Sequence, residues 1–129
     1  MRIEHVALWT EDIGRCVDFY QTYFDAVAGD RYTNPAKGFE SCFLSFGSGA
    51  RLEVMKTTSL SLQQQVVGTQ RMGLTHLAFS VGSKTQVDAL TQRLQQDGYA
   101  VLDGPRQTGD GYHESVVLDP DGNRIEVTV

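Results

Sequence analysis

The sequence has little positive charge, few cysteines and no long apolar run. Its 129 residues carry 11 Lys and Arg against 16 Asp and Glu, a formal net charge of −5. This balance gives no electrostatic support for binding nucleic acid or an anionic membrane, since both favour basic patches. No apolar run reaches the roughly 18 residues of a spanning helix. We therefore expect a cytoplasmic protein with no nucleic-acid and no membrane partner, which binds a small molecule or a second copy of itself.

The two cysteines exclude a disulfide-rich or thiolate-based design. Cys16 and Cys42 have no CxxC spacing, and each falls in an apolar pattern. Free cysteines in such patterns behave as small hydrophobic residues, so we predict that both are reduced and buried. With 40% hydrophobic residues, a chain of this length can build the core of one domain.

The chain is organised as an internal repeat in which each half begins with a histidine and ends with a glutamate. His5 and His76, two of only three histidines, occupy the third positions of the similar runs 3–8 and 74–79. Glu53 and Glu126 both lie in an Arg-x-Glu-Val context. The separation between His and Glu is nearly the same in the two halves. Such self-similarity indicates a duplicated structural unit.

Each half is predicted to fold as βαβββ, because strand-like alternation and helical periodicity recur in the same order. The fold class is α+β, with two tandem modules forming a curved mixed sheet that carries its helices on the outer face. A single domain spans 1–129, with module one at about 1–56, a linker at 57–73 that could contain a short helix, and module two at about 74–129. The expected strands are 2–10, 26–32, 39–46, 50–56, 74–81, 99–102, 113–118 and 123–129.

The helices and one turn have clear local signals. Asp12 can cap a helix that ends near Asp25, with its apolar stripe at Ile13, Cys16, Val17, Tyr20 and Phe24. Ser83 and Gln86 fit a capping box for a helix over about 84–97, followed by Gly98 and with its stripe at Val87, Leu90 and Leu94. Residues 119–123 are a turn signal in which Gly122 is available for positive φ.

The alternation also predicts a metal site. In every strand that holds one of the repeated His or Glu residues, the opposite face is the more apolar one, so all four point away from the helices. Two imidazoles and two carboxylates suit a borderline divalent ion such as Zn, Ni, Co, Fe or Mn. A lone His or Glu in a strand is usually only solvated or hydrogen-bonded. The repetition of the pair favours one four-ligand site made of His5, Glu53, His76 and Glu126.

The chain resembles the vicinal oxygen chelate superfamily, which contains glyoxalase I, bleomycin-resistance proteins, fosfomycin-resistance enzymes and extradiol dioxygenases. The resemblance rests on residues 3–7, 12–20 and 74–79, and on the ending Asp-Pro-Asp-Gly-Asn-Arg-Ile-Glu at 119–126. It implies that His5, Glu53, His76 and Glu126 correspond to the metal ligands of glyoxalase I. Where that enzyme has an Arg and an Asn that contact glutathione, this chain has Trp9 and Thr57.

The resemblance also implies a mechanism. A substrate with two adjacent oxygens would chelate the metal, and Glu126, or as second choice Glu53, would move a proton between neighbouring carbons. This predicts a lyase or isomerase of glyoxalase I type whose substrate need not carry glutathione. Two alternatives stay open, a dioxygenase or other chemistry on the same metal, and a drug-binding protein of bleomycin-resistance type. A homodimer is expected, since related short chains close their sites by pairing.

Other residues are candidates for substrate contact. Trp9 and Phe43 project from the ligand face and could form an apolar pocket wall. His113, with Ser115 and Val117, is expected on the cleft face of its strand, where it contacts substrate or serves only packing. The segment from Pro105 to Tyr112 is predicted to be a mobile loop that could close over the cleft.

Overall fold

The computed structural model describes residues 1–61, 70 and 72–129 as two compact units, Met1–Gln64 and Gln65–Val129. Each unit is a βαβββ module with its own sheet, which confirms the α+β class and the tandem repeat. The middle of the expected linker, including its possible short helix, lies outside the described residues. No helix in the described parts of the chain has the length and apolarity needed to cross a bilayer.

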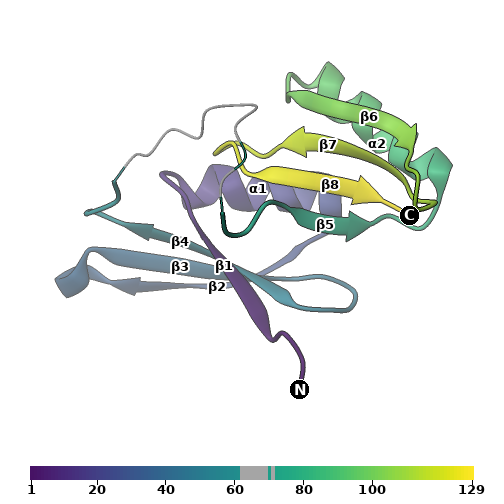
Figure 1. Ribbon diagram of the computed structural model, residues 1–129. Helices are drawn as coiled ribbons and strands as arrows, with labels where there is room; N and C mark the ends of the chain where they lie inside the picture. Colours follow the sequence, from purple (N-terminus) through teal and green to yellow (C-terminus); the bar gives the residue numbers. More distant parts are fainter. Residues whose placement is uncertain (62–69, 71) are drawn as a thin grey trace. The chain divides into compact units, whose positions relative to one another are not determined.

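Unit 1 has one helix and four strands (Figure 1). In the sheet order β1-β4-β3-β2, β1 runs parallel to β4 and the other pairs are antiparallel. Helix α1 packs on one face of this sheet, over β2, β3 and β4. The elements are β1 (His5–Trp9), α1 (Ile13–Phe24), β2 (Val27–Asn34), the 3-10 turn η1 (Pro35–Lys37), β3 (Phe39–Ser45) and β4 (Arg51–Thr57).

Unit 2 repeats this topology (Figure 1). Its sheet order is β5-β8-β7-β6, with β5 parallel to β8, and α2 packs over β6, β7 and β8. The elements are β5 (Leu77–Ser80), α2 (Lys84–Gln96), β6 (Val101–Gln107), β7 (His113–Leu118) and β8 (Arg124–Thr128).

Helix α1 begins and ends where its sequence predicts. The Asp12 side chain accepts a hydrogen bond from the backbone N–H of Arg15, which satisfies one of the free donors of the first turn. Asp25 ends the helix in the left-handed conformation, with φ of 53°. The predicted stripe is buried, and Phe19 joins it. This apolar face holds α1 on the sheet and leaves the other sheet face open.

Helix α2 also has the predicted cap but buries a different residue in its middle turn. The Ser83 hydroxyl accepts from the backbone N–H of Gln86, as expected of a capping residue. Thr91 is 3% exposed, whereas Leu90 is only half-buried. The Thr91 hydroxyl can be buried because it donates to the Val87 carbonyl and contacts the Ser115 hydroxyl at 2.6 Å. A polar pair therefore replaces the expected leucine contact.

The turn between β7 and β8 is confirmed and is built around a buried carboxylate. Asp119 is 4% exposed and accepts from the backbone N–H groups of Asp121 and Asn123 and from the Asn123 side chain. Gly122 has φ of 83°, a left-handed conformation that favours glycine. The turn sets the register of β8 and thereby the face on which Glu126 lies.

Predicted strand limits differ from the observed ones at two places that bear on the candidate site. The first strand of unit 2 begins at Leu77, so His76 lies just before it. The expected loop from Pro105 to Tyr112 belongs to β6 as far as Gln107, because two register shifts let this strand pass Gly104 and Pro105 while it stays paired with β7. The remaining residues form a tight turn in which Thr108 donates to the Tyr112 carbonyl. These contacts give no support to a mobile lid.

Candidate functional site

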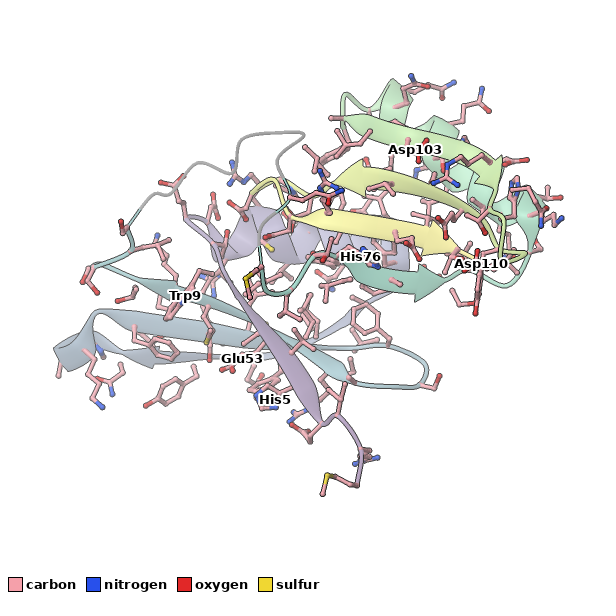
Figure 2. The ribbon with its side chains drawn as sticks, in the orientation of Figure 1. His5, Trp9, Glu53, His76, Asp103 and Asp110 are labelled. Atoms are coloured by element: carbon pink, nitrogen blue, oxygen red, sulfur yellow. The ribbon has the colours of Figure 1, made fainter. Side chains whose placement is uncertain are left out.

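Unit 1 brings His5 and Glu53 together on the sheet face opposite α1. The parallel register sets Ala7 beside Glu53 and His5 beside Arg51, so His5 and Glu53 project on the same side. The His5 Nε2 lies 3.9 Å from a Glu53 carboxylate oxygen (Figure 2). The His5 side chain is 41% exposed and that of Glu53 16%. The imidazole is therefore open to solvent, while the carboxylate is largely buried.

The His5 ring is held by its neighbours so that Nε2 faces Glu53. Its Nδ1 pairs with the Glu4 carboxylate, which also accepts from Arg51 Nε at 2.9 Å. These hydrogen bonds to His5 and Arg51 lower the pKa of Glu4. The Phe43 ring meets the imidazole edge-on, with centroids 5.3 Å apart. A carboxylate on the second ring nitrogen is the usual partner of a metal-binding histidine.

Unit 2 repeats the pair with His76 and Glu126. The His76 Nε2 lies 3.4 Å from a Glu126 carboxylate oxygen. Ala78 pairs with Glu126 in the parallel register, so the His76 and Glu126 side chains share the face opposite α2. Their side chains are 40% and 18% exposed, close to the values in unit 1. The position equivalent to Glu4 is Thr75, so His76 has a different neighbour at this point.

Both distances fit two ligands of one ion. Zinc-type ions bind imidazole nitrogen at about 2.0–2.1 Å and carboxylate oxygen at about 2.0–2.2 Å. Two such donors lie roughly 3.4 Å apart at a tetrahedral angle and at most about 4.2 Å apart. The observed 3.9 and 3.4 Å fall within this limit. Among the described residues, no three His, Cys, Asp or Glu gather as a candidate metal cluster, and each unit contributes a pair.

A residue that sequence reasoning missed, Glu114, shares the face of the second pair. Glu114 pairs with Thr128 in the β7–β8 register, one pleat beyond the Val116–Glu126 pair. Its side chain is 14% exposed, and Arg106 lies 3.8 Å away. Burial and the nearby Glu126 carboxylate raise the pKa of Glu114, although Arg106 and His76 oppose this. If β7 had been assigned the correct orientation, the alternation of its side chains would have placed Glu114 on the same face as Glu126.

The raised pKa of Glu114 leads to a stability prediction. Because Glu114 binds its proton more readily in the folded state, its charged form destabilises the fold, and this cost disappears as the pH falls through its folded pKa. We expect Glu114→Gln to raise the urea midpoint at pH 7 and to have little effect near pH 4. Urea unfolding of both proteins at the two pH values measures this. A variant that is less stable at pH 7 would contradict the prediction.

His113 lies on the other face, so the expectation that it shares a cleft face with Glu126 is wrong. Ser115 and Val117 pair with Val127 and Ile125, and all four are buried toward α2. The His113 Nε2 contacts Asp88 of α2 at 2.7 Å. Strand β7 carries apolar residues on both faces, which made its orientation ambiguous in sequence. His113 joins the strand to the helix, and its expected substrate contact loses its basis.

The open face of unit 1 is rich in aromatic residues. Phe43 pairs with Glu53 across the β3–β4 register, and Trp9 is 45% exposed on the same face (Figure 2). Trp9 and Tyr32 each meet Phe39 with ring centroids 6.2 Å apart. Thr57 pairs with Phe39 at the end of β4. The expected location of Trp9 and Phe43 beside the ligands is thus observed, whereas their contact with substrate stays a prediction.

These features define a duplicated α+β protein in which each half presents a His–Glu pair on an open sheet face. The family model of the Glyoxalase/Bleomycin resistance protein/Dioxygenase superfamily matches residues 2–127. The chain belongs to this superfamily, as its sequence motifs predicted.

Individual proteins are similar to parts or to the whole of this chain. The uncharacterized protein YqjT of Bacillus subtilis (strain 168) is 43% identical over 60 residues, which cover 44% of this chain and 47% of that protein. The match thus spans about half the length of this relative. A possible glyoxalase from Bacillus cereus has a similar structure, with a TM-score of 0.72 and 26% identity over 100% of this chain and 99% of that one. The trypanothione-dependent glyoxalase I of Leishmania major shares the fold, with a TM-score of 0.76 and 21% identity over 98% of this chain and 85% of that one.

Proposed function

We propose that this protein is a metal-dependent lyase or isomerase of glyoxalase I type, acting on a small substrate that binds the metal through two adjacent oxygens. The observation that carries the proposal is the repeated His–Glu pair, with Nε2 to carboxylate distances of 3.9 and 3.4 Å on the open faces of the two units. Membership of the superfamily supports it. The metal ligands are His5, Glu53, His76 and Glu126, and the ion is Zn, Ni, Co, Fe or Mn.

In this proposal the residues of the site have different roles. When bound, the divalent ion supplies a Lewis acid that polarises a substrate oxygen. The Glu126 carboxylate would take the proton from the carbon next to the polarised carbonyl and return it to the former carbonyl carbon, while the hydroxyl proton passes from one of the two adjacent oxygens to the other. Glu53 is the second choice for this role. Trp9 and Phe43 form an apolar wall beside the ligands, and Thr57 extends this surface. Cys16 and Cys42 are buried thiols that are not joined in a disulfide, which agrees with a cytoplasmic location.

Metal stoichiometry tests the proposal. Purified protein is titrated with Zn, Ni, Mn and Fe(II), and bound metal is measured by elemental analysis for the wild type and for His5→Ala and Glu126→Gln. If the wild type binds one ion per chain and each variant loses that ion, the two His–Glu pairs form a single four-ligand centre. Half of the metal retained in each variant would mean two independent sites. Folded protein that binds no ion would refute the enzyme as proposed. The remaining candidate function would then be the binding of a small molecule by the aromatic face of unit 1.

Glu4 provides a second prediction about the same centre. Because its carboxylate holds Nδ1 of His5 and accepts from Arg51, Glu4→Ala should leave the imidazole free to rotate. We expect metal affinity to fall about 10–100-fold, the usual effect of losing such a partner. Competition with a chromophoric chelator measures it. Thr75→Ala, at the matching position of unit 2, is the control and should bind metal as the wild type does.

We further propose a homodimer, because each sheet has one face that its own helix does not cover. Light scattering that shows a monomer at micromolar concentration would contradict this. Mixing the His5→Ala and Glu126→Gln variants then tests where the ligands come from. If each site combines two chains, random exchange restores about a quarter of the metal sites. If each site lies within one chain, mixing restores none.

A further inference from the structure

Glu114 has no part in the two His–Glu pairs, yet its side chain lies beside one of them. It comes from the middle of the sheet of unit 2, on the same face as Glu126. With 14% of its side chain exposed, it is as sheltered as the two glutamates of the pairs. The charge of a largely buried carboxylate at this place affects any molecule that binds next to Glu126.

The cation nearest to Glu114 is already engaged. The Nε of Arg106 donates to Asp103 at 2.7 Å, and the same guanidinium is 3.8 Å from Glu114. Asp110, in the turn after β6, adds a further negative charge (Figure 2). Burial is the main cause of the raised pKa of Glu114, and the carboxylates of Glu126 and Asp110 add to it. Arg124 shares this face but pairs with Leu118, on the far side of Glu126.

We propose that Glu114 selects substrates by charge, so that the proposed metal centre takes neutral or cationic chelating molecules beside His76 and Glu126 and disfavours those with a carboxylate near the chelating oxygens. The inference rests on the proposed metal site, since it concerns what binds beside His76 and Glu126. A second carboxylate brought to this face would meet Glu114 without a free cation from Arg106. A neutral or ammonium group meets no such repulsion, and an ammonium group can pair with Glu114.

Three hydroxamates with the same two-carbon segment beside the chelating group separate charge from chelation. Propanohydroxamate is neutral, 3-aminopropanohydroxamate is cationic and succinic monohydroxamate is anionic, while all three offer the same two adjacent oxygens to a metal. Their dissociation constants are measured by calorimetry on the metal-loaded protein. We expect the anionic probe to bind about tenfold more weakly than the neutral one. Tenfold corresponds to about 1.4 kcal/mol, which two like unit charges reach at roughly 12 Å when the effective dielectric constant is about 20. The cationic probe should bind at least as tightly as the neutral one.

Two variants locate the effect. Glu114→Gln keeps the shape of the side chain and should bring the neutral and anionic probes to within about twofold of each other, with metal content unchanged. Asp88→Asn removes the same charge from the opposite side of the sheet, where Asp88 contacts His113. It should leave the ratio between the probes as in the wild type, because the effect comes from a nearby charge and not from net charge.

Each outcome has one meaning. Equal binding of the three probes to the wild type, or an unchanged ratio in Glu114→Gln, would overturn the inference while the metal site stands. Tightest binding by the anionic probe would also overturn it and would point to Arg124 as an anion partner. If the protein loads no metal, or if loaded protein binds none of the probes, the proposed function fails, and the inference fails with it.

Discussion

Glu126→Gln is expected to reduce turnover by about 10²–10⁴-fold even when metal is present at saturating concentration, because the amide cannot accept the proton that we propose the carboxylate takes. The substitution keeps the size of the side chain and its place in β8, opposite Val116 and beside Ala78. A suitable assay follows conversion of hemithioacetals made from an α-ketoaldehyde and a small neutral thiol. Exchange of the substrate C–H proton with deuterated solvent, measured by NMR, reports the same step directly.

Glu53→Gln is the matched control, because Glu53 occupies the equivalent position in unit 1 and pairs with Ala7 as Glu126 pairs with Ala78. It removes one proposed metal ligand of the same type. Once metal is saturating, we expect it to lower kcat less than Glu126→Gln does. A larger loss in Glu53→Gln would assign the proton transfer to Glu53 and reverse the roles proposed for the two glutamates.

Tyr20→Ala is expected to destabilise the protein by about 3–5 kcal/mol, the range for large aromatic side chains removed from a core. Tyr20 is 0% exposed, on the face of α1 that packs against the sheet of unit 1. Its ring contacts Phe19 and Phe24, with centroids 5.1 and 5.9 Å away. The substitution leaves a cavity between helix and sheet that these neighbours cannot fill without leaving their own contacts.

Urea unfolding followed by circular dichroism measures this change. Tyr32→Ala is the control, since Tyr32 belongs to the same unit but is 56% exposed on the open face of the sheet. We expect it to cost less than about 1 kcal/mol, because little surface is buried there. Similar losses in the two variants would mean that α1 is not the main support of this sheet.

Local signals allowed the sequence to predict much of the fold. Asp12 and Ser83 act as helix caps, and the turn at Asp119 forms as expected, because each depends on hydrogen bonds within a few residues. The repeat was equally visible, since both His–Glu pairs come from equivalent positions of parallel strand pairs. Each pair needed only period-two alternation and the register of one strand pair.

The tertiary structure decided whatever depends on a more distant partner. Strand β7 carries apolar residues on both faces, so only its pairing with β8 showed that Ser115 is buried and Glu114 faces the open side. Burial of Thr91 in place of Leu90 required the Ser115 hydroxyl as partner. Strand β6 continues through Gly104 and Pro105 because bulges opposite β7 accommodate them. By itself the sequence determined the caps, the turn and the two His–Glu pairs, whose interactions are local or repeated. Pairing across the sheet and packing against α2 decided which further charges lie beside those pairs, because register sets the face of every side chain in a strand.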